Sequence, residues 1–277
     1  MITSPDIFTP TGISFTEAAP QLTHLGIGAH QDDLEIMALH GILECYKNPA
    51  QHFGGITCTS GSGSPRTGAY VSCSDEEMKQ RRQEEQCQAA RIGEYLFVAQ
   101  LGFSSAAVQD SRNTQLADAL HELLRQLHPQ VIYTHHPLDK HPTHRAVCRA
   151  VIEALRRLPK RQHPVQLLGG EVWRSLDWVT DEDKVILDVS AHPELSEKLI
   201  SIFDSQISGG KRYDLATQGR RRANATYATP HTIDQSTLAS YAIDLMPLLK
   251  NNHLTLQEFA LGFVDQFRKE IQEEGRN

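Results

Sequence analysis

The sequence is poor in cysteine, and its few cysteines are not arranged for cross-linking. The chain has five cysteines in 277 residues, an odd number, and no two of them form a Cys-x-x-Cys pair. Disulfide frameworks and thiolate zinc sites both need paired or closely spaced cysteines. The sequence therefore indicates neither and favours a reduced cytoplasmic protein. The five residues are Cys45, Cys58, Cys73, Cys87 and Cys148.

Long apolar runs and an excess of positive charge are also missing. No stretch approaches the roughly 18 uncharged apolar residues of a membrane helix. Residues 1–20 lack the basic head and apolar run of a secretory signal. The chain has 27 lysines and arginines against 34 aspartates and glutamates, a formal net charge of −7, so nonspecific nucleic-acid binding has no electrostatic driving force. We therefore expect a cytoplasmic protein with no membrane span and no nucleic-acid partner.

Two glycine-rich phosphate-binding signatures are absent as well. No Gly-x-Gly-x-x-Gly follows the first predicted strand, and the chain contains no Gly-x-x-x-x-Gly-Lys-[Ser/Thr] segment. These loops cradle phosphates through their backbone amides. Their absence argues against a nucleotide- or phosphate-binding module of the usual kind.

What the sequence does contain is an alternation of short apolar runs and segments with helical spacing. Apolar runs at 22–27, 55–59, 95–99 and 131–134 predict strands, and they alternate with predicted helices at 33–46, 74–92, 113–127 and 142–155. Ser74 and Glu77 form a capping-box pattern, and Pro142 suits the first turn of a helix. The alternation implies right-handed crossovers. It predicts an α/β, Rossmann-like fold with a mainly parallel sheet and helices on both faces.

After residue 159 the alternation loosens. Strands are predicted at 167–172 and 185–189, and helices at 193–203 and 256–273. No internal repeat or low-complexity segment divides the chain. We predict a single domain over residues 1–277, with a core at about 20–210 and a C-terminal helical addition at about 211–277.

Histidine is abundant, with 14 residues, and two clusters stand out. Residues 29–35 follow the first predicted strand, and residues 135–144 follow the fourth. In open α/β sheets, ligands bind outside the carboxyl ends of the strands. Both clusters therefore belong to the sheet edge where such a fold places its active site.

The residue types in the two clusters suit a metal. Imidazole and carboxylate are good zinc ligands, and a catalytic site uses three protein ligands with a fourth position left for water. His30 and Asp33 lie three apart at a turn into a helix, so both can face one point, and a histidine of the second cluster would complete the set. Asp32 would remain to take a proton from the water.

Each residue taken alone also has a plainer interpretation. Asp32 or Asp33 could be a helix N-cap, stabilised by backbone amides and the helix dipole. His141 and His144 could be surface residues in the first turn of a helix. Neither interpretation explains both clusters together, with complementary ligand types at equivalent strand ends.

At these residues the sequence resembles the LmbE-like and PIG-L family of N-acetylglucosaminyl deacetylases. The family's two motifs stand here as Ala-His-Gln-Asp-Asp-Leu-Glu at 29–35 and His-Pro-Thr-His at 141–144, and weaker likeness spans residues 22–225. The resemblance implies a hydrolase acting on the linear amide C–N bond of an N-acetyl amino sugar. It implies that zinc is held by His30, Asp33 and His144, that Asp32 is the general base, and that His141 stabilises the oxyanion or protonates the leaving amine.

The motifs depart from the family pattern at three positions. Gln31 stands in place of proline, at a side chain that need not touch the metal. Leu34 displaces the usual glutamate, which follows one position later as Glu35. Thr143 replaces an aspartate that would raise the pKa of His141, and Asp139 is a candidate to take over that role from two residues upstream.

Substrate contacts are less sharply indicated. The Gly-rich loop at 60–66 is a candidate cover for the sugar, and a plain mobile turn explains it equally well. Arg66 is the candidate for binding an anionic group of the substrate, and Asp110 the candidate for accepting hydrogen bonds from sugar hydroxyls. The run Arg220–Arg222 is interpreted as solvated charge, and contact with an anionic substrate is the alternative.

Other functions fit the same residues. A related amidohydrolase on a different N-acyl substrate would use identical machinery, and a non-catalytic sugar- or phosphate-binding homologue would keep only the pocket. Zinc is the expected cofactor, although an N/O ligand set also accepts iron, cobalt or nickel. The expected partner is a small amino-sugar substrate, and the sequence is compatible with a homo-oligomer.

Overall fold

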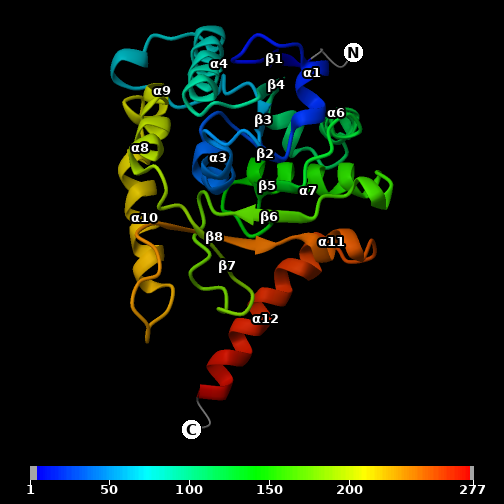
Figure 1. Cartoon of the computed structure of the whole chain (residues 1–277), viewed down its shortest axis with the longest axis vertical. Helices are drawn as coiled ribbons and strands as arrows, with labels where there is room; N and C mark the ends of the chain where they lie inside the picture. Colours follow the sequence, from blue (N-terminus) through cyan, green and yellow to red (C-terminus); the bar gives the residue numbers. More distant parts are fainter. Residues whose placement is uncertain (1–4, 275–277) are drawn as a thin grey trace.

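The computed structural model describes residues 5–274, and its centre is a mixed sheet with the strand order β1-β4-β3-β2-β5-β6-β8-β7 (Figure 1). The pairs β3–β4, β2–β3, β2–β5 and β5–β6 are parallel, whereas β1, β8 and β7 pair antiparallel at the two sides. The strands are β1 (Asp6–Phe8), β2 (His24–Gly28), β3 (Phe53–Thr59), β4 (Phe97–Phe103), β5 (Val131–His135), β6 (Gln166–Gly170), β7 (Val185–Asp188) and β8 (Ala239–Asp244).

Helices cover both faces of this sheet, each over its own apolar cluster. Residues of α6, α7 and α11 belong to one buried cluster, and residues of α2, α3, α4 and α8 belong to the other. The predicted mainly parallel sheet with helices on both faces is thereby confirmed. The helices are α1 (Phe15–Ala18), α2 (Asp33–Met37), α3 (Leu39–Cys45), α4 (Asp75–Ile92), α5 (Ser105–Gln109), α6 (Gln115–Leu124), α7 (Pro142–Arg156), α8 (Pro193–Ser201), α9 (Asp204–Ile207), α10 (Tyr213–Tyr227), α11 (Met246–Lys250) and α12 (Leu256–Glu274).

The winding of the chain changes direction between β2 and β5. From β2 the chain proceeds outward through β3 and β4 on one side, and β5 and β6 then extend the sheet on the other side of β2. Such a switch point leaves a crevice at the carboxyl ends of the two central strands. The segments that follow β2 and β5 are the two histidine-containing clusters predicted from the sequence.

Gly28 allows the first cluster to lie directly on the end of β2. A Cβ atom at Gly28 would lie 3.0 Å from Cβ of Asp33 and 3.3 Å from a methyl of Leu34. A larger side chain there would push the start of α2 away from the strand. The close approach holds Asp33 at the central edge of the sheet.

The predicted helix over residues 33–46 is interrupted in the structure. Helix α2 ends and α3 begins around Ala38, whose φ of −108° and ψ of 14° are not helical. The buried guanidinium of Arg221 donates to the carbonyl oxygens of Glu35 (2.7 Å) and Ile36 (3.2 Å), and also to Oγ of Ser196 (2.8 Å). These donors satisfy carbonyl groups that a helix end leaves without partners.

The C-terminal part differs from the predicted helical addition. The sequence predicts only helices after residue 211, but β8 lies inside the sheet between β6 and β7, and five of its six residues are buried. The run Arg220–Arg222 is also not uniformly solvated, because Arg221 is only 2% exposed.

Helix α12 extends away from the sheet (Figure 1). Among the helices within residues 5–274, none combines the length and apolarity needed to cross a bilayer.

Arg221 and its neighbour Arg222 give a matched test of this packing. We expect Arg221→Ala to lower the free energy of unfolding by about 1–3 kcal/mol, because the buried carbonyls of α2 lose their donors. The exposed side chain of Arg222 makes no such contact in the described part of the chain, so Arg222→Ala should change stability by less than about 0.5 kcal/mol. Urea denaturation followed by circular dichroism measures both, and equal effects would contradict the capping role.

Candidate metal centre

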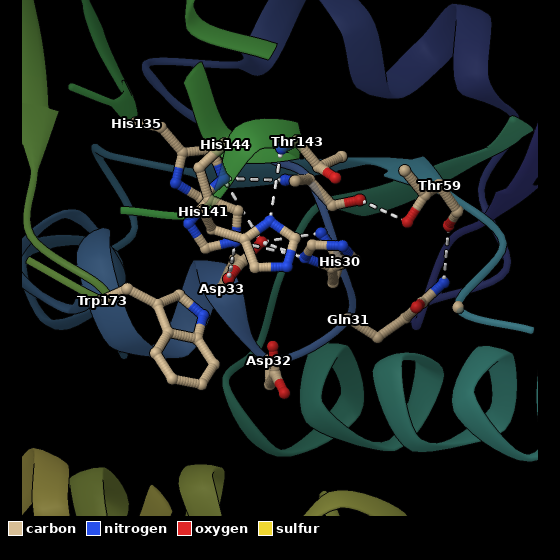
Figure 2. Close-up of polar contacts among 12 residues, drawn as sticks. His30, Gln31, Asp32, Asp33, Thr59, His135, His141, Thr143, His144 and Trp173 are labelled. Atoms are coloured by element: carbon tan, nitrogen blue, oxygen red, sulfur yellow. Dashed lines mark hydrogen bonds and ion pairs between the residues drawn. The ribbon is translucent and has the colours of Figure 1, made fainter. Parts of the chain in front are cut away.

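Side chains from both clusters meet beyond the carboxyl ends of β2 and β5, which are paired in register from His24–Val131 to Ile27–Thr134 (Figure 2). His30 and Asp33 come from the turn after β2 and the first residue of α2. His144 comes from the first turn of α7, where Pro142 occupies an early helical position that needs no backbone donor. The structure therefore brings together three residues that the sequence singled out.

The three side chains place their polar atoms close together. Nδ1 of His30 lies 3.2 Å from Nε2 of His144, one oxygen of the Asp33 carboxylate lies 3.3 Å from His30 Nδ1, and the other oxygen lies 3.4 Å from His144 Nε2. Two groups of described residues have ligand atoms close enough for one ion: His30, His141 and His144, and Asp33, His135 and His144. A tetrahedral zinc site with bonds of about 2.0–2.1 Å places its ligand atoms about 3.3–3.4 Å apart. The spacing and the chemistry of this donor set therefore fit a zinc ion.

The charge states of these groups also fit a metal. Burial lowers the pKa of His144 to about 3, which keeps its imidazole neutral near pH 7. Burial alone would raise the pKa of Asp33. The imidazoles of His144 and His135 beside it together have a larger, opposite effect, so the pKa lies well below the usual range. A neutral imidazole and an ionised carboxylate are the forms that bind metals.

His135 is the site residue that the sequence did not single out within its cluster. It ends β5 and is fully buried, and its ring stacks on His144 with centroids 3.9 Å apart. Its Nε2 accepts a hydrogen bond from the backbone N–H of Ala29 (2.9 Å) and lies 3.2 Å from the Asp33 carboxylate. His135 thus contacts both the segment after β2, at Ala29 and Asp33, and the start of α7, at His144. Its place as the last strand residue is the only sequence signal for it.

Asp139 lies beside Nδ1 of His144, whereas the other ring nitrogen of His144 faces His30 and Asp33. One carboxylate oxygen lies 3.5 Å from Nδ1 of His144 and accepts from the backbone N–H of Trp173 (3.1 Å), and the other accepts from the backbone N–H of His141 (2.8 Å). Burial raises the pKa of Asp139, but His144 and the backbone of His141 lower it well below the usual range. Asp139 therefore contacts the ring of His144 and only the backbone of His141.

His141 is the N-cap of α7 and lines the cavity beside the cluster. Its Nδ1 accepts a hydrogen bond from the backbone N–H of Thr143 (3.3 Å), so the hydrogen of the neutral ring is on Nε2. Burial and the neighbouring His30 lower the pKa of His141. The hydroxyl of Thr143 accepts from Gln109 (2.8 Å) and leaves the imidazole of His141 without a carboxylate on that side.

Asp32 lies beside the cluster with an unusual backbone. Its φ of 99° is in the left-handed region, and its side chain makes no capping hydrogen bond to α2. Strained positions of this kind concentrate at functional sites. Its buried carboxylate lies 3.3 Å from the guanidinium of Arg82. Burial is the largest effect on the pKa of Asp32, and it raises that pKa. The guanidinium of Arg82 lowers the pKa, but the nearby carboxylates of Asp33 and Glu35 raise it, so that it lies well above its usual value.

Asp32, Arg82 and, from the cluster, His30 and Asp33 line a cavity of about 410 Å³. Arg82, on α4, donates to Oγ of Ser64 (2.5 Å) and to the backbone carbonyl of Gln31, so it also holds the loop after β3. Gln31 points away from the cluster and donates to the carbonyl of Thr59 (3.1 Å) (Figure 2). The cavity is also lined by Val172, Trp173, Gln206, Lys211 and Tyr213.

The structure does not bring the two predicted substrate contacts to this cavity. Arg66 donates to the carboxylate of Asp75 (2.6 Å) and to the carbonyl of Ser62 (2.5 Å), away from the cavity lining. Asp110 is bound to Arg112 on the surface. Both charges already have local partners, which the sequence alone did not reveal. The arginine that lines the cavity is Arg82.

Comparison with solved structures finds the same fold. A diacetylchitobiose deacetylase from Pyrococcus horikoshii is 17% identical, with a TM-score of 0.63 over 83% of this chain and 85% of that one. A conserved protein from Thermus thermophilus is 20% identical, with a TM-score of 0.61 over 82% of this chain and 96% of that one. A 4-carboxy-2-hydroxymuconate hydratase from Pseudomonas putida is 16% identical, with a TM-score of 0.62 over 81% and 96%.

Comparison by sequence points to one family. No curated protein matches the chain. The family model for PIG-L, described as GlcNAc-PI de-N-acetylase, matches residues 25–155, the segment that supplies His30, Asp32, Asp33, His141 and His144. The resemblance to the PIG-L and LmbE-like deacetylase family, predicted from the two motifs, is confirmed.

Proposed function

We propose that this protein is a zinc-dependent hydrolase that removes the N-acetyl group from a GlcNAc-type amino sugar or its conjugate. The observation that carries the proposal is the mutual approach of His30, Asp33 and His144 to within 3.4 Å, with Asp32 beside them at the cavity. Three protein ligands with an open fourth position are the pattern of catalytic zinc sites. The family match supports deacetylation as the reaction.

In this proposal His30, Asp33 and His144 hold the metal. Zinc bound there would act as a Lewis acid and lower the pKa of a water in its open position to about 7. The set of two imidazoles and one carboxylate is also acceptable to iron, cobalt or nickel. Metal analysis of the purified protein identifies which ion it carries.

Asp32 is the proposed general base. Burial raises the pKa of Asp32, which makes its carboxylate a stronger base than that of an exposed aspartate. Asp32 accepts a proton from the attacking water as the water oxygen bonds to the amide carbonyl carbon. The same proton then passes to the nitrogen as the C–N bond breaks, giving acetate and a free amine. Arg82 keeps the carboxylate at the cavity wall.

His141 is the proposed oxyanion stabiliser. Its Nδ1 is occupied by the backbone N–H of Thr143, so the neutral ring has its N–H on Nε2. A hydrogen-bond donor placed where negative charge develops on the carbonyl oxygen lowers the barrier for acyl transfer. The lowered pKa of His141 favours this role over that of a proton donor to the leaving amine.

The substrate class is supported by the comparisons rather than by the fold. The Pyrococcus protein named above is a deacetylase for a disaccharide of N-acetylated sugars, whereas the Pseudomonas protein with the same fold is a hydratase. The fold alone is therefore compatible with different reactions, and the residues of the cluster decide between them. Measuring acetate released from GlcNAc, GlcNAc phosphates, diacetylchitobiose and GlcNAc glycosides tests the proposal. Release from a non-sugar N-acetyl compound alone would favour the related amidohydrolase.

Asp32→Asn separates the general base from the metal ligands. Asparagine has nearly the same shape and tolerates the left-handed backbone at this position. We expect Asp32→Asn to keep its zinc and to lose hydrolysis by about 10²- to 10⁴-fold in kcat, the usual contribution of a general base. Asp33→Ala and His144→Ala should lose the metal itself, as measured by plasma emission analysis. Wild-type turnover in Asp32→Asn would refute the assigned role.

Asp139→Asn tests the support behind His144. Removing the carboxylate near Nδ1 should weaken zinc binding by about 10- to 100-fold, because partners of metal-binding histidines tune their orientation and basicity. Competition with a zinc-binding dye measures the affinity. Asp110→Asn, at an exposed carboxylate away from the cavity, is the matched control and should leave the zinc affinity unchanged. A normal affinity in Asp139→Asn would mean that its contact with His144 is only structural.

Chelation provides a test of the cofactor. Removing metal with a chelator should abolish acetate release, and adding zinc to the dialysed protein should restore it, because the ligand set is complete within the chain. Cobalt is expected to restore activity as well. Full activity in a sample verified to be metal-free would overturn the metal-dependent mechanism.

A further inference from the structure

A cavity of about 280 Å³ is lined by residues of α8, of α10 and of the segment before β8. Figure 1 shows α8 and α10 next to each other, and the two helices are in contact. None of the residues that line this cavity lines the catalytic cavity. A ligand bound here is therefore separate from the substrate. The polar residues of the lining are Ser196, Glu197, Gln218, Arg221, Arg222 and Thr237.

Arg221 is a buried cation that has no carboxylate partner within residues 5–274. It is almost inaccessible to solvent, and burial lowers its pKa to about 10, so its guanidinium stays charged near pH 7. Buried charges in proteins are normally paired, because a charge that leaves water loses its hydration. Arg221 departs from this rule. The arginines that do form ion pairs in the described chain are Arg66, Arg82, Arg91, Arg112, Arg125, Arg157, Arg212 and Arg268.

The hydrogen bonds of Arg221 leave its charge uncompensated. Its two terminal nitrogens donate to Oγ of Ser196 and to the carbonyl oxygens of Glu35 and Ile36, which carry no net charge. Glu171 is near enough to raise the pKa of Arg221 but makes no ion pair with it. Nε of Arg221 is buried and has no hydrogen-bond partner among the described residues. The guanidinium therefore has both a charge and a donor left for a ligand.

Arg222 adds a second cation to the lining. Its side chain is exposed, and in the described part of the chain it makes neither an ion pair nor a hydrogen bond. Gln218, one turn earlier on α10, and the hydroxyls of Ser196 and Thr237 add neutral donors to the same cavity. Guanidinium groups combined with such donors are the usual protein ligands of phosphate-like oxyanions.

Of the described lining residues, Glu197 alone carries a carboxylate. Its side chain is exposed, and it is not at ion-pair distance from Arg221 or Arg222. The lining thus contains two cations and one anion, whereas the whole chain has a net charge of −7. A local excess of positive charge in a cavity raises the local concentration of anions.

We propose that this cavity binds a tetrahedral oxyanion of the phosphate class, held by Arg221 and Arg222, at a site separate from the catalytic one. Binding of this anion does not depend on the proposed hydrolysis. Arg221 connects the ligand to the catalytic part of the chain, because the same guanidinium holds the carbonyls near the end of α2, the helix that begins with Asp33. An anion beside Arg221 therefore stabilises the fold around α2.

Inorganic phosphate is the probe for this site. Calorimetric titration and thermal unfolding are measured on the full chain with zinc supplied, and sodium chloride keeps the ionic strength constant. We expect saturable binding of phosphate and a rise in Tm of about 2–5 °C at ten times its Kd. Sulfate should compete with phosphate, because it presents the same tetrahedral set of oxygens. A chain that binds neither anion would rule out the site.

Arg222→Ala is the deciding variant, because Arg221 also caps α2 and its removal disturbs the fold. We expect Arg222→Ala to weaken phosphate binding by about tenfold, the loss of one charged hydrogen bond, and to leave the Tm without phosphate unchanged. Arg161→Ala removes another exposed arginine that has no ion pair within residues 5–274 and lies outside this cavity. It should leave phosphate binding unchanged.

Glu197→Gln should have the opposite effect to Arg222→Ala. Removing the carboxylate of the lining should tighten phosphate binding by about two- to fivefold, because an exposed like charge repels the ligand weakly. Phosphate binding that Arg222→Ala leaves intact would contradict the proposal. If that binding also disappeared when zinc is removed, it would belong to the catalytic cavity. Acetate release, assayed separately, reports on the proposed function and decides nothing about this site.

Discussion

The approach of two imidazole nitrogens, on His30 and His144, to 3.2 Å is the constraint on which the rest of the site depends. At that separation the two nitrogens either share the N–H of one neutral imidazole or bind a common cation. The pairing of β2 with β5 makes the approach possible, because it brings the ends of both strands to one edge. The carboxylate of Asp33 beside the two rings adds the negative charge that a bound cation needs in the function that we propose.

The part of the site that could be predicted from the sequence is the part set by local spacing. His30 and Asp33 belong to one helix start, so strand order and residue type were enough to group them with a histidine of the second cluster. The resemblance to the deacetylase motifs specified that histidine as His144. Arg82 and Trp173 could not be found in this way. Their contacts come from a helix and a loop that meet the cluster only in the folded chain. Asp110 and Arg66 were favoured as substrate contacts from their residue types, and the sequence did not reveal their ion pairs with exposed neighbours, because those partners follow no pattern.

The fold was predictable where strands are apolar and alternate with helices. Strands β2, β3, β4 and β5 are buried, and their parallel order follows from the helices between them. Strand β8 was missed because Ala239–Asp244 is rich in small residues. It also pairs antiparallel, so the alternation of strands with crossover helices does not predict it. The break between α2 and α3 was missed for another reason. The donor that satisfies the end of α2 is Arg221, which lies far along the chain.

The two walls of the catalytic cavity come from different parts of the chain. The groups to which we assign the reaction lie within residues 30–144, whereas residues beyond 170, including Trp173, Lys211 and Tyr213, supply other parts of the lining. In the function that we propose, bond breaking and ligand choice are thus assigned to different stretches of polypeptide. Replacement of the second stretch can redirect the molecule to a new compound without rebuilding the first, which gives one scaffold a route to many substrates.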